Sequence, residues 1–395
     1  MAKPRVGVVF AQFAAYHVDR CQAAAVRLGD RYEVVAVEVA GASETYAWEP
    51  SGEVKGAAKV TLFPGVVSES IGWWRKFQAL LPVLRQCRWV FCGVPSSEPE
   101  IVLLSWVLPR LGTKMVMLTE SKYDDFPRRR YFEFFKAQLY RPYHGAIVGG
   151  RRQAEYLRSL GFGGRPLLPG YDTVDLDRVR RQSGVPPAPK GAPFAERAFI
   201  FVGRFVAKKN LLVLVDAFAR YRALAGPNAR NLVLVGSGPM REAIDRKIRQ
   251  HGIEDAVRFP GFLDAAEVAR AMAASLALIL PSTEEQWGLV VNEAVACGLP
   301  AIVSEAVGAR DALVRERENG YVFRSEDVEG LAQAMLAMGA DEAHWRAMCE
   351  RSLELNWMGH SDRFADAVET MIEGPSSPSS EHIARFEQAL GIGKE

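Results

Sequence analysis

The sequence has no hydrophobic run long enough to cross a bilayer. One of its longest apolar stretches, residues 101–108, ends at Pro109, whereas a membrane-spanning helix needs about 20 such residues. Residues 1–5 lead directly into a strand-like run at residues 6–10, where a secretory leader would have its apolar region. We therefore expect a cytoplasmic protein.

Cysteines are few and scattered. The chain has five, at positions 21, 87, 92, 297 and 349, and no two of them form a CxxC pair. An odd number without such spacing argues against both a disulfide framework and a zinc site. We expect reduced thiols.

A large excess of charge of one sign is also missing. The formal net charge is +2, which together with the lack of a recognition motif argues against a nucleic-acid partner. The charge is nevertheless uneven, because residues 1–190 carry 27 Lys and Arg against 18 Asp and Glu, and the remainder carries 22 against 29. This asymmetry favours different partners for the two halves, although chance scatter over a neutral surface gives the same count.

Short apolar runs alternate with longer helical stretches, and this pattern occurs twice. Several runs are continuously apolar, as in parallel strands that are buried on both faces. We predict strands at residues 6–10, 33–39, 59–63, 89–93, 114–118, 145–148, 198–202, 231–235, 257–260, 276–280, 301–304 and 321–323.

The alternation predicts an α/β fold of two tandem Rossmann-like, doubly wound domains that face each other across a cleft. Residues 183–193 are rich in Pro and Gly and are predicted to link the domains. We place the first domain at residues 1–185 and the second at residues 186–350. A helix at residues 351–374 is expected to pack back on the first domain, and residues 375–395 to form a flexible tail.

Two motifs of the second half lie where a strand runs into a turn. Gly203, Arg204 and Lys209 follow the first strand, and two cations near a helix start can clamp a diphosphate. Two surface cations without a ligand are the alternative. Gly236 and Gly238 follow the next strand, where glycine often serves only the conformation of the turn.

A third and stronger motif joins a strand, a loop and a helix at residues 281–294. Glu285 lies in the loop, a helix is predicted to begin near Gly288, and Glu293 falls inside it. Two carboxylates beside a helix N-terminus suit a nucleotide sugar, because carboxylates bind sugar and ribose hydroxyls while free N–H groups bind phosphate. An exposed position for Glu293 on the helix surface is the alternative.

Together with Phe259-Pro-Gly-Phe262, these motifs resemble glycosyltransferase family 4, whose members are retaining enzymes of GT-B fold. The resemblance covers roughly residues 197–335 and is weaker before them. It implies that Arg204 and Lys209 bind the donor diphosphate. It also implies that Glu285 binds the donor sugar and Glu293 the ribose. The implied donor site further includes Gly203, Gly236, Gly238, Phe262, Gly288, Leu289 and Val290.

The resemblance implies catalysis without a metal or other cofactor. No DxD motif occurs in the loops of the second half that are predicted to face the cleft, although Asp124-Asp125 occurs elsewhere. Arg204 and Lys209 would then do what a divalent cation does in other sugar transferases.

The first half departs from the commonest pattern of the family. Its first strand is followed by a bulky turn in place of glycines, and Tyr16 and His17 in that turn are candidate acceptor ligands. A histidine beside a helix start is more often structural. Glu120 and Asp124 follow the strand at residues 114–118, and Glu120 stands where family members often have a histidine. Either carboxylate can position or deprotonate an acceptor hydroxyl, and a solvated loop is the alternative.

Two segments of the first half combine aromatic and basic residues, namely residues 72–77 and 128–136. Such a composition suits the surface of an anionic membrane. Aromatic residues that pack in the core are the alternative. We therefore expect a peripheral contact with the inner face of a membrane.

The sequence predicts a retaining glycosyltransferase that moves a sugar from a nucleoside-diphosphate sugar to an acceptor glycan, lipid-linked sugar or small molecule. The reaction would serve polysaccharide, glycolipid or other glycoconjugate synthesis, with UDP favoured by its frequency in the family. We assign catalysis to Glu285, Arg204, Lys209 and Glu120, with the departing phosphate expected to take the acceptor's proton. A nucleotide-sugar epimerase of the same fold and a non-catalytic nucleotide-sugar-binding scaffold are the alternatives.

Overall fold

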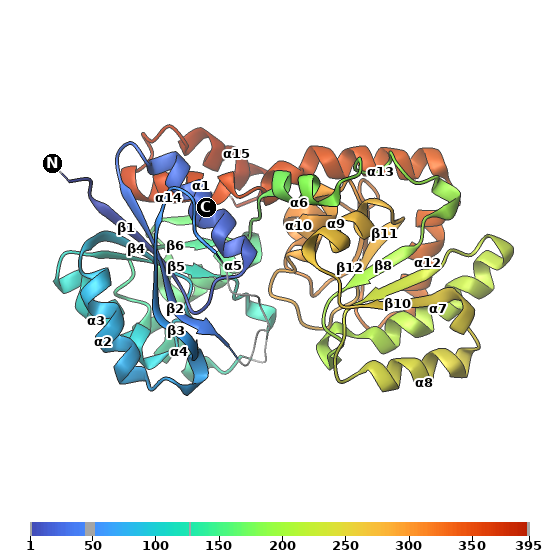
Figure 1. Ribbon diagram of the computed structural model, residues 1–395, viewed down its shortest axis with the longest axis horizontal. Coiled ribbons are helices and arrows are strands. Elements are labelled where there is room, and N and C mark those ends of the chain that lie inside the picture. The colour runs from blue at the N-terminus through green and yellow to red at the C-terminus, as the bar shows by residue number, and fades with distance from the viewer. Residues whose placement is uncertain (1, 44–51, 126–127, 393–395) are drawn as a thin grey trace. The chain divides into compact units, whose positions relative to one another are not determined.

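The computed structural model describes residues 2–43, 52–125 and 128–392. The chain divides into two compact units, which are residues 1–175 with 360–395 (unit 1) and residues 176–359 (unit 2). Each unit contains a parallel sheet flanked by helices (Figure 1).

Unit 1 is built on a seven-stranded sheet in the order β3-β2-β1-β4-β5-β6-β7. Its strands are β1 Arg5–Phe10, β2 Glu33–Ala42, β3 Ala58–Val67, β4 Cys87–Cys92, β5 Lys114–Thr119, β6 Gly145–Val148 and β7 Leu167–Pro169. Its helices are α1 Ala15–Leu28, α2 Trp73–Leu84, α3 Pro99–Arg110, α4 Arg130–Leu139, α5 Arg151–Leu157, α14 Asp362–Glu373 and α15 Ser380–Leu390. The central strand β1 pairs in parallel with β2 and β4, with Val8 opposite Ala36 and Phe91.

Unit 2 has a six-stranded sheet in the order β10-β9-β8-β11-β12-β13. Its strands are β8 Phe199–Val202, β9 Leu232–Val235, β10 Val257–Gly261, β11 Ala277–Leu280, β12 Ala301–Ser304 and β13 Gly320–Phe323. Its helices are α6 Leu176–Ser183, α7 Leu211–Ala225, α8 Arg241–His251, α9 Ala265–Ala273, α10 Val290–Ala296, α11 Arg310–Leu313, α12 Val328–Ala340 and α13 Glu342–Leu355. All pairings are parallel, so the carboxyl ends of these strands meet at one edge of the sheet.

The prediction of two Rossmann-like α/β domains is confirmed. The central strands β8 and β11 are almost wholly buried, as their continuous apolar sequences indicate. The strand that the sequence did not predict is β7, which has only three residues and ends in a proline. Such a short run carries too few residues for a periodic signal.

The unit boundary lies before residue 176, whereas the sequence placed it near residue 185. The physical reason is α6, which packs on α9 and α10 with Leu176 and Val179 buried. The segment at residues 183–193 is not an interdomain linker but part of unit 2. Within it, Ala188 is fully buried and its N–H donates to the Cys297 carbonyl at 2.8 Å.

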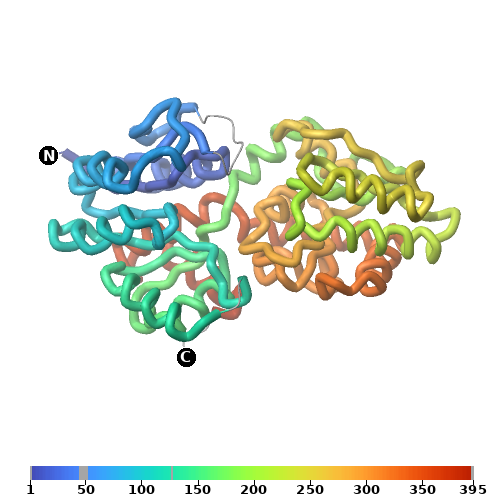
Figure 2. Tube along the Cα trace, turned by 90° about the horizontal axis from the view of Figure 1, so that it is seen from below, coloured from blue at the N-terminus to red at the C-terminus, as the bar shows by residue number. Residues whose placement is uncertain are grey.

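The structure of residues 351–395 also differs from the prediction. The single helix expected at residues 351–374 is divided, because α13 ends at Leu355 in unit 2 and α14 begins at Asp362 in unit 1. The tail expected to be flexible contains α15, whose Ile383 and Phe386 are buried. In two views the red C-terminal segment lies within the body that contains the blue N-terminus (Figures 1 and 2).

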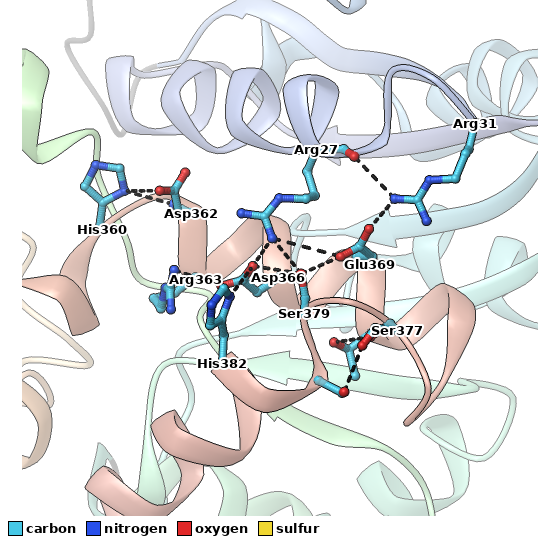
Figure 3. A network of polar contacts seen from close by, with 12 residues as sticks. Arg27, Arg31, His360, Asp362, Arg363, Asp366, Glu369, Ser377, Ser379 and His382 are labelled. Carbon is cyan, nitrogen blue, oxygen red and sulfur yellow. Dashed lines mark hydrogen bonds and ion pairs between the residues drawn. The ribbon is translucent and has the colours of Figure 1, made fainter.

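Helices α1, α14 and α15 are joined by a C-terminal polar network, formed by Arg27, Arg31, Arg363, Asp366, Glu369, Ser379 and His382 (Figure 3). The Asp366 carboxylate, fully buried, accepts hydrogen bonds from Arg27 and from Ser379 Oγ. Phe364 and Val368 of α14 join the hydrophobic core beneath. This packing is the reason why the C-terminal helices belong to unit 1.

All five cysteines are free and buried. Burial raises the pKa of Cys21 and of Cys92 to about 12, so both stay protonated thiols at neutral pH. The described helices include none that combines the length and the apolar character required to cross a membrane.

Candidate functional site

The loops that follow the strands of unit 2 form a hydrogen-bonded rim at the carboxyl edge of its sheet. The N–H of Gly236, after β9, donates to the Gly261 carbonyl at 2.8 Å, and the N–H of Phe205, after β8, donates to the Ser237 carbonyl at 2.7 Å. Further along, the N–H of Thr283, after β11, donates to the Lys208 carbonyl at 2.9 Å. The segments predicted to bind a donor therefore lie side by side in the fold.

Glycine is required where two of these loops approach each other closely. Gly236 has φ = +125°, and a Cβ there would lie 2.1 Å from the Gly203 carbonyl oxygen. Gly238 has φ = +152°, and its Cβ would lie 2.6 Å from the carbonyl oxygen of Phe205. Both glycines let the backbone of one loop pack directly against the backbone of the next.

Lys209 and Glu285 meet across this rim. Lys209 ends a short 3₁₀ turn after β8, and its Nζ forms an ion pair and a hydrogen bond with Glu285 Oε2 in the loop after β11. Ser282 Oγ donates to the same carboxylate oxygen at 3.0 Å. The two side chains are only 16% and 15% exposed. The structure thus brings together a cation and a carboxylate that the sequence assigned to one site.

Hydrogen bonds other than the Lys209 contact hold the loop that carries Glu285. The N–H of Gly308 donates to the Glu285 carbonyl at 3.2 Å, and the N–H of Ala309 donates to the Trp287 carbonyl at 2.9 Å. Trp287 is buried and donates from Nε1 to Asn292 Oδ1 at 2.9 Å. These bonds hold the loop independently of the Lys209 contact.

Helix α10 begins at Val290, two residues later than the sequence predicted, because Gly288 adopts φ = +100° and Leu289 precedes the first helical residue. Glu293 lies in the first turn of α10 and is half-buried. Burial first, and then the Glu293 carboxylate, raise the pKa of Cys297, the residue that follows α10, to about 12.

Two of the predicted donor residues are far more exposed than the rest. Arg204 follows Gly203 and is exposed, whereas Lys209 is largely covered. Phe262 follows β10 and is 79% exposed. The structure places both residues in loops of the rim.

Unit 1 contains a cavity of about 670 Å³ beside the carboxyl ends of β1, β2, β4 and β5. Tyr16, His17 and Glu120, three of the predicted acceptor residues, line it. Asp124 does not line the cavity. Its carboxylate lies 3.3 Å from Lys122 Nζ and 3.0 Å from an Arg152 guanidinium nitrogen, so it belongs to a neighbouring ion-pair network.

His17 is held as a neutral imidazole. Its Nδ1 accepts a hydrogen bond from the Ala14 N–H at 3.0 Å, and the ring stacks on Phe10 with centroids 4.0 Å apart. Burial, and secondarily the Arg20 guanidinium, lower the pKa of His17 well below its ordinary value. These contacts give the histidine a role in holding the start of α1.

Glu120 forms a carboxyl pair with Asp172. Asp172 is 1% exposed, and its carboxyl group interacts with that of Glu120. Burial, and then the charge of Glu120, raise the pKa of Asp172 well above its ordinary value, although Arg20 opposes this shift. Burial and the charge of Glu120 thus favour the neutral form of the Asp172 carboxyl group.

Sequence reasoning missed much of the cavity lining. Gln12, Glu98 and Glu100 line it, together with Trp73 and Lys76. The signal that could have found the first three is their position shortly after β1 and β4, with Gln12 and Glu98 in the loops and Glu100 in the first turn of α3, at the edge where parallel sheets bind ligands. Asp172 was not among the predicted site residues, and its contact with Glu120 is not visible in the sequence.

A family profile described as "Glycosyl transferases group 1" matches residues 188–353. This part of the chain is a group 1 glycosyltransferase domain. It comprises nearly all of unit 2, including the loops of the rim. The predicted resemblance to glycosyltransferase family 4 is thereby confirmed.

Curated relatives align with slightly less than half of the chain. N-acetyl-alpha-D-glucosaminyl L-malate synthase of Bacillus anthracis is 31% identical over 184 residues, which are 47% of this chain and 45% of that protein. D-inositol 3-phosphate glycosyltransferase of Stackebrandtia nassauensis is 32% identical over 198 residues, 46% of this chain and 44% of that protein. The alignments therefore span less than half the length of these relatives.

Solved structures resemble almost the entire chain. Sucrose-phosphate synthase of Thermosynechococcus elongatus has a TM-score of 0.71 at 18% identity, covering 94% of this chain and 98% of its own. Anabaena HepE, solved in complex with UDP, has a TM-score of 0.69 at 15% identity, covering 93% of this chain and 99% of its own. The fold is GT-B, with unit 1 and the group 1 domain as its two Rossmann-like halves.

Proposed function

We propose that the protein is a retaining glycosyltransferase that moves a sugar from a nucleoside diphosphate to an acceptor hydroxyl during glycoconjugate synthesis. The observation that carries the proposal is the Lys209–Glu285 pair within the rim of a group 1 domain. A cation and a carboxylate at the carboxyl edge of a parallel sheet suit the two ends of a sugar diphosphate.

In this proposal the donor binds to the rim of unit 2. Lys209 and Arg204 neutralise the diphosphate, and the backbone of residues 288–290 contributes N–H groups to the leaving phosphate. Glu285 binds hydroxyls of the donor sugar, and Glu293 binds the ribose. Stabilising negative charge on the departing phosphate is the main contribution of the protein to the rate.

In the same proposal unit 1 binds the acceptor. The acceptor hydroxyl attacks from the face that the nucleoside diphosphate leaves, so the anomeric configuration is retained. The departing phosphate takes the proton of that hydroxyl, and Glu120 orients the hydroxyl. Asp172, whose carboxyl group interacts with that of Glu120, keeps the Glu120 side chain in place.

The test is incubation with a panel of nucleotide sugars and candidate acceptors, with nucleoside diphosphate release as readout. Release with retained configuration, seen by NMR of the product, is the expected result. Activity in excess EDTA is also expected, because the cationic residues perform the role of a metal. A converted nucleotide sugar would indicate an epimerase, and binding without turnover would indicate a scaffold. UDP sugars are the first to test, since HepE was solved with UDP and with UDP-glucose.

We further propose a membrane contact through α4. This helix buries none of its residues, and Tyr131, Phe132, Phe134 and Phe135 are 51–63% exposed. Such a face beside Arg129 and Arg130, which are exposed too, suits the interface of an anionic bilayer.

Arg128 and Lys136, the other two cations of residues 128–136, contact unit 1. They are therefore not part of the proposed membrane surface. The Arg128 guanidinium lies over the Tyr156 ring at 4.4 Å and donates to the Tyr123 carbonyl at 3.0 Å. Lys136 Nζ donates to Tyr156 Oη at 2.9 Å. Arg128 and Lys136 therefore anchor α4 on unit 1, whereas the sequence had counted both among the membrane-facing charges.

A further inference from the structure

The cavity of unit 1 has an excess of hydrogen-bond acceptors. Its described lining carries four carboxylates and one ammonium group, from Glu69, Glu98, Glu100, Glu120 and Lys76. The single lysine is already engaged, with Nζ 3.6 Å from Glu100 Oε1. The imidazole of His17, held neutral, adds no positive charge. An anion that entered this cavity would meet like charges in partly desolvated surroundings, which is unfavourable.

Two buried acceptor atoms of the lining have no donor among the described residues. Glu100 is 2% exposed and its Oε2 accepts no hydrogen bond, while Gln12 is 3% exposed and its Oε1 accepts none. The Gln12 amide nitrogen contacts the Gly41 carbonyl at 3.4 Å. Buried acceptors without a donor are unfavourable. A ligand that supplies O–H or N–H groups would satisfy both atoms.

Aromatic side chains complete the wall. Trp73, at the start of α2, is 47% exposed, and Tyr16 and Tyr171 line the same cavity. Aromatic rings offer an apolar surface with a partly negative face. The C–H face of a sugar ring or the cationic group of an amino sugar can pack against it.

The geometry points to a polyhydroxyl ligand without negative charge, a neutral or amino sugar, as the occupant of this cavity. Hydroxyl or ammonium donors pair with Gln12 and Glu100, whereas a phosphate or carboxylate group of the ligand would bring only further acceptors. If the ligand is the acceptor substrate, the inference rests on the proposed function and restricts it to acceptors whose bound part is uncharged or cationic.

Binding to the full chain, measured by saturation-transfer NMR and calorimetry, tests this inference. The probes are glucose, galactose and mannose, their 2-amino derivatives and their 6-phosphates, all with saturating UDP so that the donor site is occupied. At least one neutral or amino sugar should bind roughly tenfold more tightly than its 6-phosphate, because the site's buried acceptors discriminate against a ligand that leaves them unpaired. Equal or tighter binding of the 6-phosphates would overturn the inference, and so would failure of every neutral and amino sugar to bind.

Variants locate the preference in the cavity. Glu98→Gln and Glu100→Gln each remove one negative charge and should reduce the difference between a sugar and its 6-phosphate. Glu155→Gln, on the exposed surface of α5 and outside the cavity lining, is the control and should leave the difference unchanged. Glu98 is half-buried, so its variant remains informative if Glu100→Gln fails to fold. An unchanged difference in folded Glu98→Gln and Glu100→Gln would place the preference elsewhere and overturn the inference.

The donor assay separates this inference from the proposed function. Sugar binding with the expected preference, but without release of nucleoside diphosphate from any donor, would contradict the proposed transferase and leave the cavity inference standing. Sugar transfer that prefers phosphorylated acceptors would support the proposed transferase and contradict the cavity inference.

Discussion

At the scale of single residues, the ion pair of Lys209 and Glu285 joins loops that are 76 positions apart in the sequence. Each side chain is largely covered, so each charge compensates for the lost hydration of the other. Lys208, the next residue along the chain, has the same charge but is 46% exposed and lies 3.7 Å from Glu284. The two lysines differ in burial and partner, so Lys208 is a matched control for the proposed role of Lys209.

Replacing Lys209 should therefore weaken donor binding. We expect Lys209→Ala to lower affinity for UDP or kcat/KM at least about tenfold, because a charged hydrogen bond contributes roughly 1.5–3 kcal/mol. Calorimetry and steady-state kinetics measure the two quantities, and thermal unfolding checks the fold. Lys208→Ala is the matched control and should change neither. If both variants behave alike, Lys209 has no special role in the donor site.

The Glu120–Asp172 pair makes stability depend on pH in a definite direction. The pKa of Asp172 in the folded chain is raised above its ordinary value by burial and then by Glu120. The folded state therefore binds more protons than the unfolded state, and the stability contributed by Asp172 is lost as pH rises through its raised pKa. Asp172→Asn keeps a hydrogen-bond donor and removes the titration. Denaturant unfolding at several pH values should show a smaller loss of stability between acidic and neutral pH in this variant.

Asp124 provides a control of opposite sign. Burial alone would raise the pKa of Asp124, but the charges of Lys122 and Arg152 outweigh it and hold the pKa below its ordinary value. Its contribution is lost as pH falls, so Asp124→Asn should reduce stability at neutral pH more than in acid. If the free energy of unfolding depends on pH in the same way in the wild type and in Asp172→Asn, the pairing of Asp172 with Glu120 is contradicted.

Individual site residues were predictable only where chemistry and position coincide. Glu120 and Lys209 follow strands in the sequence, and this placement together with the resemblance to glycosyltransferase family 4 predicted them as site residues. Asp172 follows a strand that was not predicted, β7, and its contact with Glu120 arises from tertiary packing. The opposite orientations of Arg128 and Arg129 were not predictable either, because Tyr156, which determines one of them, lies on α5.

At the scale of elements, α14 is tied to α1 by charges that are deeply buried. Asp366 Oδ2 lies 2.9 Å from an Arg363 guanidinium nitrogen, and Oδ1 accepts hydrogen bonds from Arg27 and Ser379 (Figure 3). Glu373 also pairs with Arg31 but is 23% exposed, and Arg31 keeps a second partner in Glu369. The contributions of the two carboxylates to stability should therefore differ.

We expect Asp366→Ala to lower the free energy of unfolding by about 3–5 kcal/mol, because it removes the fully buried carboxylate that the Arg27 and Arg363 guanidinium groups share. Glu373→Ala, the control, should cost less than about 1 kcal/mol, as is usual for partly exposed pairs. Denaturant unfolding followed by circular dichroism measures both. Similar losses in the two variants would show that burial does not govern this network.

The strands of both sheets were largely predictable because buried parallel strands have continuous apolar sequences. The units to which α13 and α14 belong were not predictable, because a helical sequence pattern does not show which hydrophobic core the helix packs against. Val368 and Met371 of α14 pack in unit 1, whereas Trp345 and Met348 of α13 are buried in unit 2. The polar and glycine residues between α13 and α14 are too few to have predicted that the helix is interrupted there.

At the scale of the whole molecule, donor and membrane contacts are assigned to different units, so they should respond to mutation independently. Arg129→Glu with Arg130→Glu should reduce binding to anionic vesicles at low salt about tenfold or more, because each basic residue near such a surface contributes about 1 kcal/mol. Affinity for UDP should not change. Vesicle sedimentation and calorimetry measure the two quantities.

The control reverses two exposed arginines of unit 2, Arg220 and Arg346, which are 49% and 50% exposed. Its vesicle binding should resemble that of the wild type. If the wild type does not bind anionic vesicles at all, the exposed aromatic face of α4 has no membrane role. If the Arg129 and Arg130 variant loses UDP affinity while folded, the two contacts are not independent.

The order of synthesis on the ribosome gives the discontinuous unit 1 a consequence in the cell. Its sheet leaves the ribosome first, but α14 and α15 follow only after all of Leu176–Gly359 has been translated. At ~5–20 residues per second that interval lasts roughly 10–40 s. During it the surface that Phe364 and Val368 will cover stays open, while unit 2, a continuous segment, can fold as it emerges. A nascent chain that stops before residue 360 would carry a complete group 1 domain and an unfinished first unit, which chaperones and proteases would recognise by its exposed apolar surface.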